Sequence, residues 1–355
     1  MNKLLTIIIP SYNMEKYLER CCSSLVVDDA ELMARLEVLV VNDGSTDQTS
    51  EIGHAWEAKH PGVFRVIDKP NGHYGSCVNR GLAEAKGVFV KVLDADDYCE
   101  RANFGALVAE LVKHEESDVD LVVSDFVDVD GDGHVVHGHP SPPFAPCVPL
   151  PQSECPLPAR RLALHMIVYR TERVRLIGYR QTEGVAYTDT EWVTTPMAAV
   201  RKALYFPRVV TNYLIGRNGQ TMDPATYARD FQVVVKLVIG LVERCRELNV
   251  EREGARLYRN QLKHSVGMVY AALSPVNSRY REYTGDLREF DRRIGGAMPE
   301  FRAVADEVAA KSRVFPFRPY PALRKYGTFN CPPVWLYLAY QAIADLIKKF
   351  IRRNG

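Results

Sequence analysis

The sequence predicts an α/β fold: a doubly wound, mixed but mostly parallel sheet, followed by a helical C-terminal region. Three observations support this prediction. Apolar, β-branched runs alternate with helical patterns through the first 125 residues. Polar residues follow three of the predicted strands at the point where each strand ends. From about 225 to 310 the chain is rich in helix formers, and its apolar positions recur at intervals of three and four.

Strands and helices are expected to alternate along the N-terminal part. The apolar runs that predict strands lie at 4–9, 37–41, 63–67, 88–93 and 119–124. The helical patterns between them lie near 14–26, 47–58, 75–86 and 101–114. Ligands of a doubly wound sheet bind beyond the carboxyl ends of its strands, so the three polar strand ends should face one cleft.

The alternation breaks between about 126 and 160. Residues 140–158 hold eight prolines, which predicts an irregular loop. Residues 128–133 mimic the opening of a calcium-binding EF-hand loop, but its twelfth position is His139 instead of the bidentate Glu that Ca²⁺ requires. This segment is therefore predicted to be a polar hairpin turn. Helix and strand patterns resume at 160–215.

Composition limits the class of protein. The chain has 355 residues, of which 46% are hydrophobic, and a formal charge of +1, which gives no support for nucleic-acid binding. The first ten residues lack the apolar length and cleavage site of a signal peptide, and no stretch is apolar enough to span a bilayer. We therefore expect a cytoplasmic protein. Its eight cysteines include no CxxC pair, which predicts free thiols.

The C-terminal tail predicts an amphipathic helix at 333–353 with a basic end. Its apolar face is formed by Leu336, Tyr340, Ile343, Ile347 and Phe350. Lys348, Lys349, Arg352 and Arg353 follow at the end of the same helix. This pattern is typical of a helix that lies on an anionic lipid surface, here the inner face of the plasma membrane. It is equally typical of a terminal helix packed on its own domain.

The strongest chemical signal is an acidic cluster, Asp94, Asp96 and Asp97, at the end of the predicted strand 88–93. Three carboxylates this close repel one another unless a cation lies between them. Oxygen-only ligation suits Mg²⁺ or Mn²⁺, which also bind substrate phosphates. The alternative is an acidic turn that precedes the helix at 101–114.

Three ordered motifs at strand ends resemble the family-2 glycosyltransferases of GT-A fold. The motifs are Pro10–Asn13, Val41–Asp47 and Leu93–Asp97. The resemblance covers about the first 125 residues and extends weakly to about 221. It implies a divalent metal, Mn²⁺ or Mg²⁺, and inverting transfer of a sugar from a UDP-sugar to a carbohydrate or lipid-linked acceptor. The implied setting is the assembly of bacterial surface polysaccharide.

The resemblance also implies which residues bind the donor. Asp43 would hydrogen-bond the uracil or ribose, Asp94 would lie near the ribose, and Asp96 would bind the metal that bridges the diphosphate. The other implied donor-binding residues are Pro10, Tyr12, Asn13, Asn71, Gly75 and Arg217. Arg217 pairs with phosphate in this interpretation and is a surface side chain in the alternative one. Many family members carry an Arg at the position that Val78 occupies in this chain.

Inverting transfer needs a base that takes the proton of the acceptor hydroxyl. The family supplies it from an acidic pair, and the segment Tyr187–Trp192 occupies the corresponding place. Asp189 matches the position of the base, although Thr188 stands where Glu is frequent. Glu191 is the alternative base. The predicted acceptor contacts are Gln181 and Trp192.

The resemblance assigns residues 1–222 to the GT-A domain. Within it, 1–125 is the nucleotide-binding half, 126–160 the Pro-rich loop and 161–222 the acceptor half, and 223–355 forms the helical C-terminal region. One alternative is a nucleotidyltransferase, but such an enzyme usually has a basic, Gly-rich loop where this chain has Pro10–Asn13. A non-catalytic sugar-nucleotide-binding scaffold is the other alternative, which Thr188 and Val78 keep open.

Overall fold

The computed structural model describes residues 2–139, 141–158, 160–217, 230–247, 256–272, 284–307 and 319–326, with short pieces between 335 and 347. The chain divides into two compact units. The first comprises Met1–Tyr227 and Leu248–Gln261, and the second comprises Ala228–Glu247 and Leu262–Gly355. The predicted domain boundary at residue 222 lies outside the described residues.

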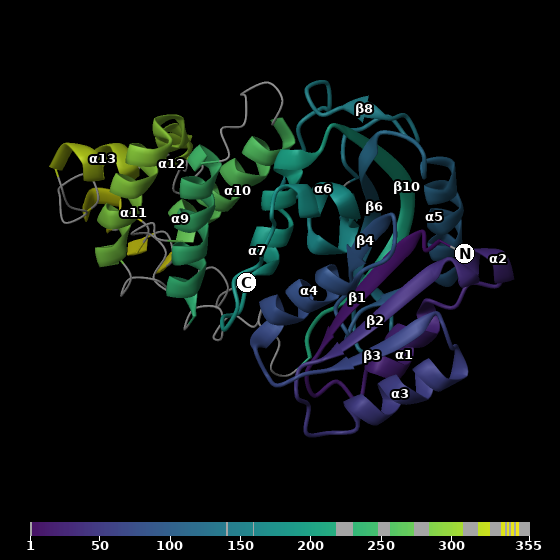
Figure 1. Ribbon diagram of the computed structural model, residues 1–355. Coiled ribbons are helices and arrows are strands. Elements are labelled where there is room, and N and C mark those ends of the chain that lie inside the picture. The colour runs from purple at the N-terminus through teal and green to yellow at the C-terminus, as the bar shows by residue number, and fades with distance from the viewer. Residues whose placement is uncertain are drawn as a thin grey trace. The chain divides into compact units, whose positions relative to one another are not determined.

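The first unit is built on one mixed sheet, which confirms the predicted α/β class. Its main path has the strand order β3-β2-β1-β4-β9-β6-β10-β5 (Figure 1). These strands are β1 (Leu5–Ser11), β2 (Leu36–Asn42), β3 (Phe64–Asp68), β4 (Phe89–Val92), β5 (Tyr98–Cys99), β6 (Val119–Val129), β9 (Ile167–Arg170) and β10 (Lys202–Leu214). β1 pairs in parallel with β2 and β4, whereas β9 runs antiparallel between β4 and β6.

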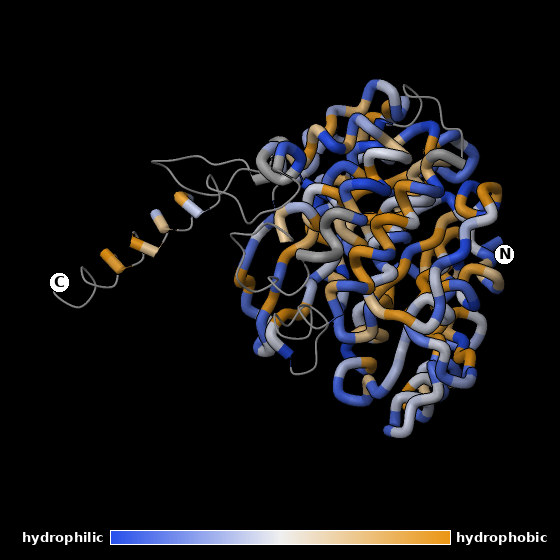
Figure 2. Tube along the Cα trace, turned by 90° about the vertical axis from the view of Figure 1, so that its left-hand side faces the viewer, coloured by the Kyte–Doolittle hydropathy of each residue, from blue (hydrophilic) through white to orange (hydrophobic). Residues whose placement is uncertain are grey.

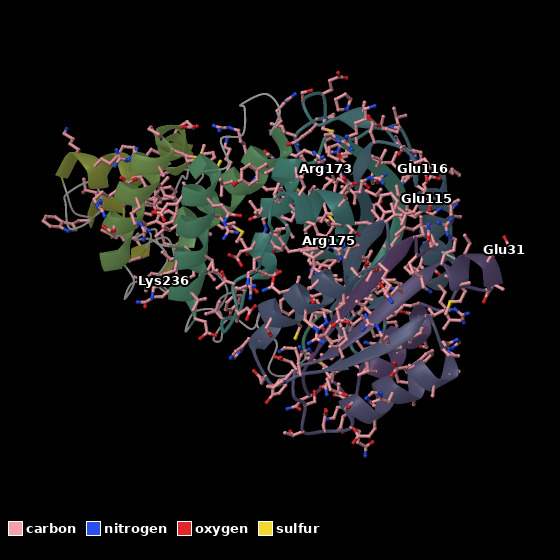
Figure 3. The ribbon with its side chains drawn as sticks, viewed as in Figure 1. Glu31, Glu115, Glu116, Arg173, Arg175 and Lys236 are labelled. Carbon is pink, nitrogen blue, oxygen red and sulfur yellow. The ribbon has the colours of Figure 1, made fainter. Side chains whose placement is uncertain are left out.

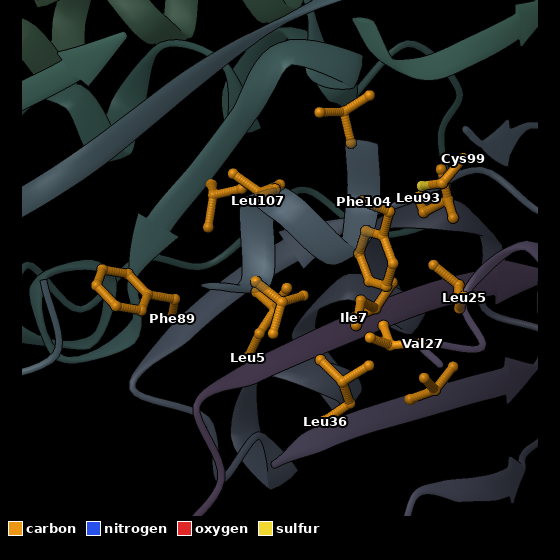
Figure 4. Close-up of a cluster of buried hydrophobic side chains, with 14 of the residues drawn as sticks. Leu5, Ile7, Leu25, Val27, Leu36, Phe89, Leu93, Cys99, Phe104 and Leu107 are labelled. Carbon is orange, nitrogen blue, oxygen red and sulfur yellow. The ribbon is translucent and has the colours of Figure 1, made fainter. Parts of the chain in front are cut away.

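The helices lie on both faces of this sheet. They are α1 (Leu18–Ser24), α2 (Ala30–Ala34), α3 (Thr49–Lys59), α4 (His73–Glu84) and α5 (Arg101–Lys113). Because side chains alternate along a strand, β1 contacts a different layer through each of its faces. Leu5, Ile7 and Ile9 join one buried cluster with residues of α1 and α5. Figure 4 shows Leu5 and Ile7 in this cluster with Phe104 and Leu107 of α5. On the opposite face, a Cβ added to Gly81 of α4 would lie 2.5 Å from Ile8, so glycine allows α4 to approach β1 closely.

A hairpin follows β6, as the sequence predicted. β6 pairs antiparallel with β7 (Val135–Gly138), and the Asp130 carboxylate accepts hydrogen bonds from the N–H groups of Asp132 (3.0 Å) and His134 (2.9 Å). The regular structure therefore ends later than the predicted break at 126, because pairing on both sides extends β6 to Val129. The described part of 141–158 is irregular except for β8 (Leu150–Pro151).

Short elements complete the first unit and connect α4 to the rest of the domain. They are η1 (Leu164–Met166), α6 (Thr171–Leu176), α7 (Asp189–Trp192) and η2 (Thr195–Ala199). Arg175 of α6 donates hydrogen bonds to the carbonyls of Leu82 (2.6 Å) and Ala85 (2.7 Å) at the end of α4 (Figure 3). A cationic donor satisfies the carbonyls that a helix C-terminus leaves unpaired, so Arg175 fixes this end of α4.

The second unit is helical, as the sequence predicted. Its elements are α9 (Phe231–Glu247), the later part of α10 (Arg256–Ala272), α11 (Thr284–Ala297), η4 (Pro299–Phe301), α12 (Arg302–Glu307) and α13 (Pro319–Tyr326). Asp291 of α11 lies at the centre of a polar network. Its carboxylate accepts a hydrogen bond from Tyr270 (2.9 Å) and pairs with Arg324 (3.0 Å) and Arg302 (3.2 Å). This network links four helices around one buried charge.

The described pieces of the tail expose large apolar side chains. Figure 2 shows these pieces as mostly hydrophobic segments. The exposed side chains are those of Trp335, Leu336, Ile343, Leu346 and Ile347. Much of the predicted helix 333–353 lies outside the described residues. Among the described helices, none is both long and apolar enough to cross a membrane.

Candidate active site

A cavity of about 360 Å³ opens at the carboxyl ends of β1 and β2, beside the start of α4. It is lined by Pro10, Ser11, Tyr12, Met14, Asp43, Asn71, His73, Tyr74 and Cys77. This volume is within the range of small-molecule sites. The structure thus brings Pro10, Tyr12, Asp43 and Asn71 together, four of the residues that the sequence analysis assigned to the nucleotide.

Asn13 connects the loops beside this cavity. Its backbone has φ 54°, a left-handed conformation that asparagine tolerates better than most residues. Its side-chain oxygen accepts a hydrogen bond from the N–H of Thr46 (2.9 Å), and its own N–H donates to Ser45 (3.0 Å). Asn13 therefore holds the loop after β1 against the loop after β2.

Asp43 is a buried carboxylate with a cationic partner that the sequence analysis missed. Lys69 donates a hydrogen bond to Asp43 and two more to the Pro70 carbonyl (2.7 Å) and the Ser76 hydroxyl (2.8 Å). The N–H of Gly72 also donates to Asp43, at 3.0 Å. Removal of one partner of a buried ion pair leaves an uncompensated charge, so Lys69 stabilises Asp43 in this position.

Gly75, a predicted donor contact, packs closely against the loop that crosses α4. It does not line the cavity, and a Cβ at this position would lie 1.9 Å from the carbonyl oxygen of Thr182. The loop that crosses α4 here is also fixed by Asn79. Its side chain donates to the Gln181 carbonyl (2.9 Å) and accepts from the Gln181 N–H (2.8 Å). Glycine is required because the backbones of α4 and this loop are in contact.

The acidic loop after β4 gives its three carboxylates different partners. Asp94 accepts a hydrogen bond from the Tyr74 hydroxyl (2.7 Å), which links the loop to the cavity. Asp96 forms an ion pair with Arg217. Asp97 is fully buried and accepts a hydrogen bond from the N–H of Leu214 (2.9 Å) at the end of β10. Asp97 therefore joins this loop to a neighbouring strand.

The electrostatics of the loop favour a bound cation. Burial, followed by the negative charges of Asp97 and Asp96, raises the pKa of Asp94 to about 7. Burial and Asp96 also raise the pKa of Asp97 well above its ordinary value. Lys91 lies beneath the loop in β4, 1% exposed, and burial lowers its pKa to about 8. One buried lysine and Arg217 leave the three carboxylates incompletely compensated.

The donor atoms of this region suit a divalent metal. Carboxylate oxygens of Asp94 and Asp97 and a ring nitrogen of His165 lie within 4.8 Å of one another. The second oxygen of Asp97 is buried and has no hydrogen bond among the described residues, and the His165 Nδ1 atom lies 3.1 Å from it. Oxygen donors with one imidazole are compatible with Mn²⁺. Asp96, the predicted ligand, is beside this group.

α7 presents two acidic residues with different environments. The Asp189 side chain is 39% exposed and lies 3.9 Å from Arg161. Burial raises the pKa of Asp189 while Arg161 opposes the rise, and solvent at the exposed part of the side chain limits it. Glu191 is buried instead, and its carboxylate accepts hydrogen bonds from the Thr182 N–H (2.7 Å) and hydroxyl (2.9 Å). Of the two, Asp189 has the accessible carboxylate.

The predicted acceptor contacts of Trp192 and Gln181 are wrong, because both side chains are in the core. Trp192 is fully buried, with its ring edge-to-face against Tyr169 and Tyr179. Gln181 is 1% exposed and donates its side-chain amide to the Thr188 hydroxyl (2.8 Å). A tryptophan beside a polar segment resembles a sugar-stacking residue in sequence, but here it forms the packing support of α7.

The mixed sheet, with a cavity at the carboxyl ends of β1 and β2, has the arrangement of a GT-A fold. The comparisons with known proteins agree: residues 6–172 match the family model Glycosyl transferase family 2. The uncharacterized glycosyltransferase EpsJ of Bacillus subtilis is 35% identical over 122 residues, which cover 34% of this chain and 33% of EpsJ. Hyaluronan synthase of Pasteurella multocida is 40% identical over 97 residues, which cover 27% of this chain and 10% of the synthase.

Two solved structures share the fold. S. aureus TarS 1–349 in complex with UDP-GlcNAc has a TM-score of 0.58 at 20% sequence identity. The match covers 85% of this chain and 83% of the TarS chain. Mannosyltransferase PcManGT from Pyrobaculum calidifontis, in complex with GDP-Man and Mn²⁺, has a TM-score of 0.50 at 15% identity and covers 86% of each chain. Residues 6–172 are therefore similar in sequence to the family-2 glycosyltransferases, and the two solved structures show the same fold.

Proposed function

We propose that this protein transfers a sugar from a UDP-sugar to a carbohydrate or lipid-linked acceptor, with inversion and with a divalent metal, in the assembly of a surface polysaccharide. The observation that carries the proposal is the meeting of three features in the first unit. They are a cavity of nucleotide size, a charged acidic loop linked to it through Tyr74 and Asp94, and the accessible carboxylate of Asp189. The Pasteurella multocida matches, named as hyaluronan and chondroitin synthases, support polysaccharide synthesis.

In this proposal the cavity holds the uridine. Asp43, fixed by Lys69, accepts hydrogen bonds from the base N–H or the ribose hydroxyls, since an ionised carboxylate only accepts. Pro10, Tyr12, Asn13 and Asn71 frame the nucleoside, as expected from the sequence. The half-exposed ring of Tyr12 is available for stacking on the base.

The acidic loop holds the diphosphate side of the donor. Asp96 is the proposed metal ligand and Asp94 the ribose-side group. The charge that develops on the departing nucleoside diphosphate would be neutralised by Mn²⁺ or Mg²⁺ held at this loop. Arg217 neutralises Asp96 in the present structure, and it becomes available to pair with phosphate when a divalent cation takes this role.

Asp189 is the proposed base. It accepts the proton of the acceptor hydroxyl as that oxygen attacks the anomeric carbon. Glu191 is the weaker choice because both of its oxygens already accept hydrogen bonds from Thr182. We expect Asp189→Asn to lower kcat by at least about 100-fold with little change in UDP affinity. Near-normal turnover in Asp189→Asn, together with loss of turnover in Glu191→Gln, would assign the base to Glu191 instead.

The tail is proposed to contact the membrane surface. Its exposed apolar side chains, including Trp335 and Leu336, precede a basic stretch at 348–353. Apolar area and basic charge together are what binding to anionic lipid requires. Flotation with vesicles that contain anionic lipid should recover the full chain and not a truncation before Trp335. Equal recovery of both would remove this part of the proposal.

A screen of donors with the purified protein tests the proposal as a whole. UDP release from UDP-glucose, UDP-galactose and UDP-N-acetylglucosamine is measured with and without Mn²⁺. We expect metal-dependent release from one of these donors. Tight binding of UDP without release from any sugar nucleotide, even with acceptor extracts, would favour the non-catalytic scaffold. Release of pyrophosphate from a nucleoside triphosphate would favour a nucleotidyltransferase.

A further inference from the structure

The β6–β7 hairpin carries a group of metal-ligating side chains that none of the roles proposed above uses. This hairpin cluster consists of Asp128 of β6, His137 of β7 and His139, which follows the end of β7. Asp128 is the cross-strand partner of His137 in the antiparallel register. Because side chains alternate along an extended chain, His137 and His139 lie on the same side of it. The pairing therefore brings two imidazoles and one carboxylate to one face of the hairpin.

The Asp128 carboxylate lies between the two imidazoles. Its Oδ1 atom is 2.7 Å from Nε2 of His139, and its Oδ2 atom is 3.6 Å from Nδ1 of His137. The Asp128 side chain is 14% exposed, and within the described ranges no lysine or arginine forms an ion pair with it. A carboxylate that is largely removed from water is stabilised by a positive charge beside it. A cation held by both imidazoles would supply that charge.

The two histidines differ in how firmly they are held. The His139 ring stacks on Phe126, with centroids 4.0 Å apart and ring planes 12° apart. Stacking occupies the face of this imidazole and leaves its edge for Asp128. The His137 side chain is 66% exposed, so it can turn toward His139 and an ion can reach it from solvent. The cluster thus offers two positioned ligands and one adjustable ligand.

The separations of the ligand atoms are close to those of a tetrahedral metal site. Metal–ligand distances of about 2.0–2.2 Å place neighbouring ligand atoms roughly 3.4 Å apart. The 3.6 Å between Asp128 and His137 is near this value. The contact between Asp128 and His139 would open by about 0.7 Å as the ion replaces the hydrogen bond. Two imidazoles with one carboxylate suit Zn²⁺, Ni²⁺ or Cu²⁺, whereas Mg²⁺ and Ca²⁺ prefer oxygen ligands alone.

We propose that Asp128, His137 and His139 form a binding site for a divalent transition-metal ion, with Zn²⁺ as the probe. The three side chains supply three ligands and leave a fourth position for water. The site does not depend on the proposed transfer reaction, because none of its residues has a role in that reaction.

The turn of the same hairpin holds a second group of possible ligands, Asp130, Asp132 and His134. Their ligand atoms lie within 4.8 Å of one another. This group has only one imidazole, and one Asp130 oxygen already accepts hydrogen bonds from two backbone N–H groups. It is therefore the weaker candidate for Zn²⁺ and provides the control for the test.

The test is calorimetric titration of the full chain with Zn²⁺ in the presence of saturating Mg²⁺. Mg²⁺ competes for the oxygen donors of the acidic loop and poorly for imidazole. His137→Gln removes an exposed imidazole, and His139→Phe keeps a ring against Phe126 while it removes both nitrogens. The matched control is His134→Gln, which removes an imidazole from the same hairpin but outside the cluster.

Wild type should bind one more Zn²⁺ per chain than the double variant His137→Gln/His139→Phe. Each single variant should weaken this binding at least about tenfold, and His134→Gln should bind Zn²⁺ as wild type does. Zn²⁺ should also raise the melting temperature of wild type more than that of the double variant. Circular dichroism checks the fold, and Asp128→Asn replaces His139→Phe if the latter does not fold.

Three results would each overturn the inference. The first is unchanged Zn²⁺ binding in the double variant, and the second is an equal loss in His134→Gln, which would assign the ion to the turn. The third is binding by wild type only at millimolar Zn²⁺, which would show adventitious contact with surface histidines. UDP release from the donor panel would be unaffected by any of these results, so the proposed function is tested separately.

Discussion

Replacement of Asp94 by Asn should make the metal-free protein more stable at neutral pH. Asp94 is half-buried among like charges, and burial with Asp97 and Asp96 raises its pKa to about 7 from the ordinary value of 3.8. The folded state therefore binds the proton more tightly than the unfolded state does. The stability from this proton is fully present below pH 3.8 and is lost as the pH rises through about 7.

The magnitude follows from the shift. The pKa values of about 7 and 3.8 differ by about 3 units, which corresponds to at most about 4 kcal/mol at roughly 1.4 kcal/mol per unit. Solvent at the exposed part of the side chain reduces this, and we expect about 1 to 2 kcal/mol. The amide introduced by Asp94→Asn would keep an acceptor for the Tyr74 hydroxyl, so the variant removes the charge without removing that hydrogen bond.

The assay is urea unfolding of wild type and Asp94→Asn at pH 5, 6, 7 and 8, first with chelator and then with Mn²⁺. With chelator, the free energy of unfolding of the variant should exceed that of wild type by an amount that grows between pH 5 and pH 8. With Mn²⁺, wild type should regain this difference, because the metal stabilises the ionised carboxylate. A difference that is constant with pH, or that Mn²⁺ does not affect, would refute the reasoning.

Other parts of the site give further predictions. Lys69→Met should lower UDP affinity by at least about tenfold and destabilise the fold by about 3 kcal/mol, because Asp43 loses its buried partner. Calorimetry measures the affinity and urea unfolding the stability, and a UDP affinity equal to that of wild type would contradict this prediction. Arg217→Ala should bind Mn²⁺ alone more tightly but UDP with Mn²⁺ more weakly, by titration calorimetry; parallel changes would contradict an exchange at Asp96. Gly75→Ala should lower the melting temperature, and an unchanged one would contradict the contact with Thr182.

The sequence predicted the sheet because its signals are local. The apolar runs and the turn residues at their ends fix β1, β2 and β4 without reference to the rest of the chain. The cavity could be predicted for the same reason, since Pro10 and Asp43 end adjacent parallel strands. The hairpin after β6 was also predicted from local Asp and Gly chemistry.

Residues that act through tertiary contacts could not be predicted. Lys69 appears in sequence as an ordinary charged residue before a turn, and only the fold brings it to Asp43. His165 has no motif around it, and three strands determine its environment. Trp192 shows the opposite error. Its residue type suggested a sugar contact, whereas its burial is set by the packing of Tyr169 and Tyr179.

The most direct test of the central claim is UDP release from the donor panel with Mn²⁺, for wild type, Asp96→Ala and Asp189→Asn. We predict release by wild type only when metal is present. Asp96→Ala should lose metal-dependent UDP binding, whereas Asp189→Asn should bind UDP and metal normally and release UDP at least about 100-fold more slowly. Metal-independent release, or undiminished release by both variants, would contradict the account.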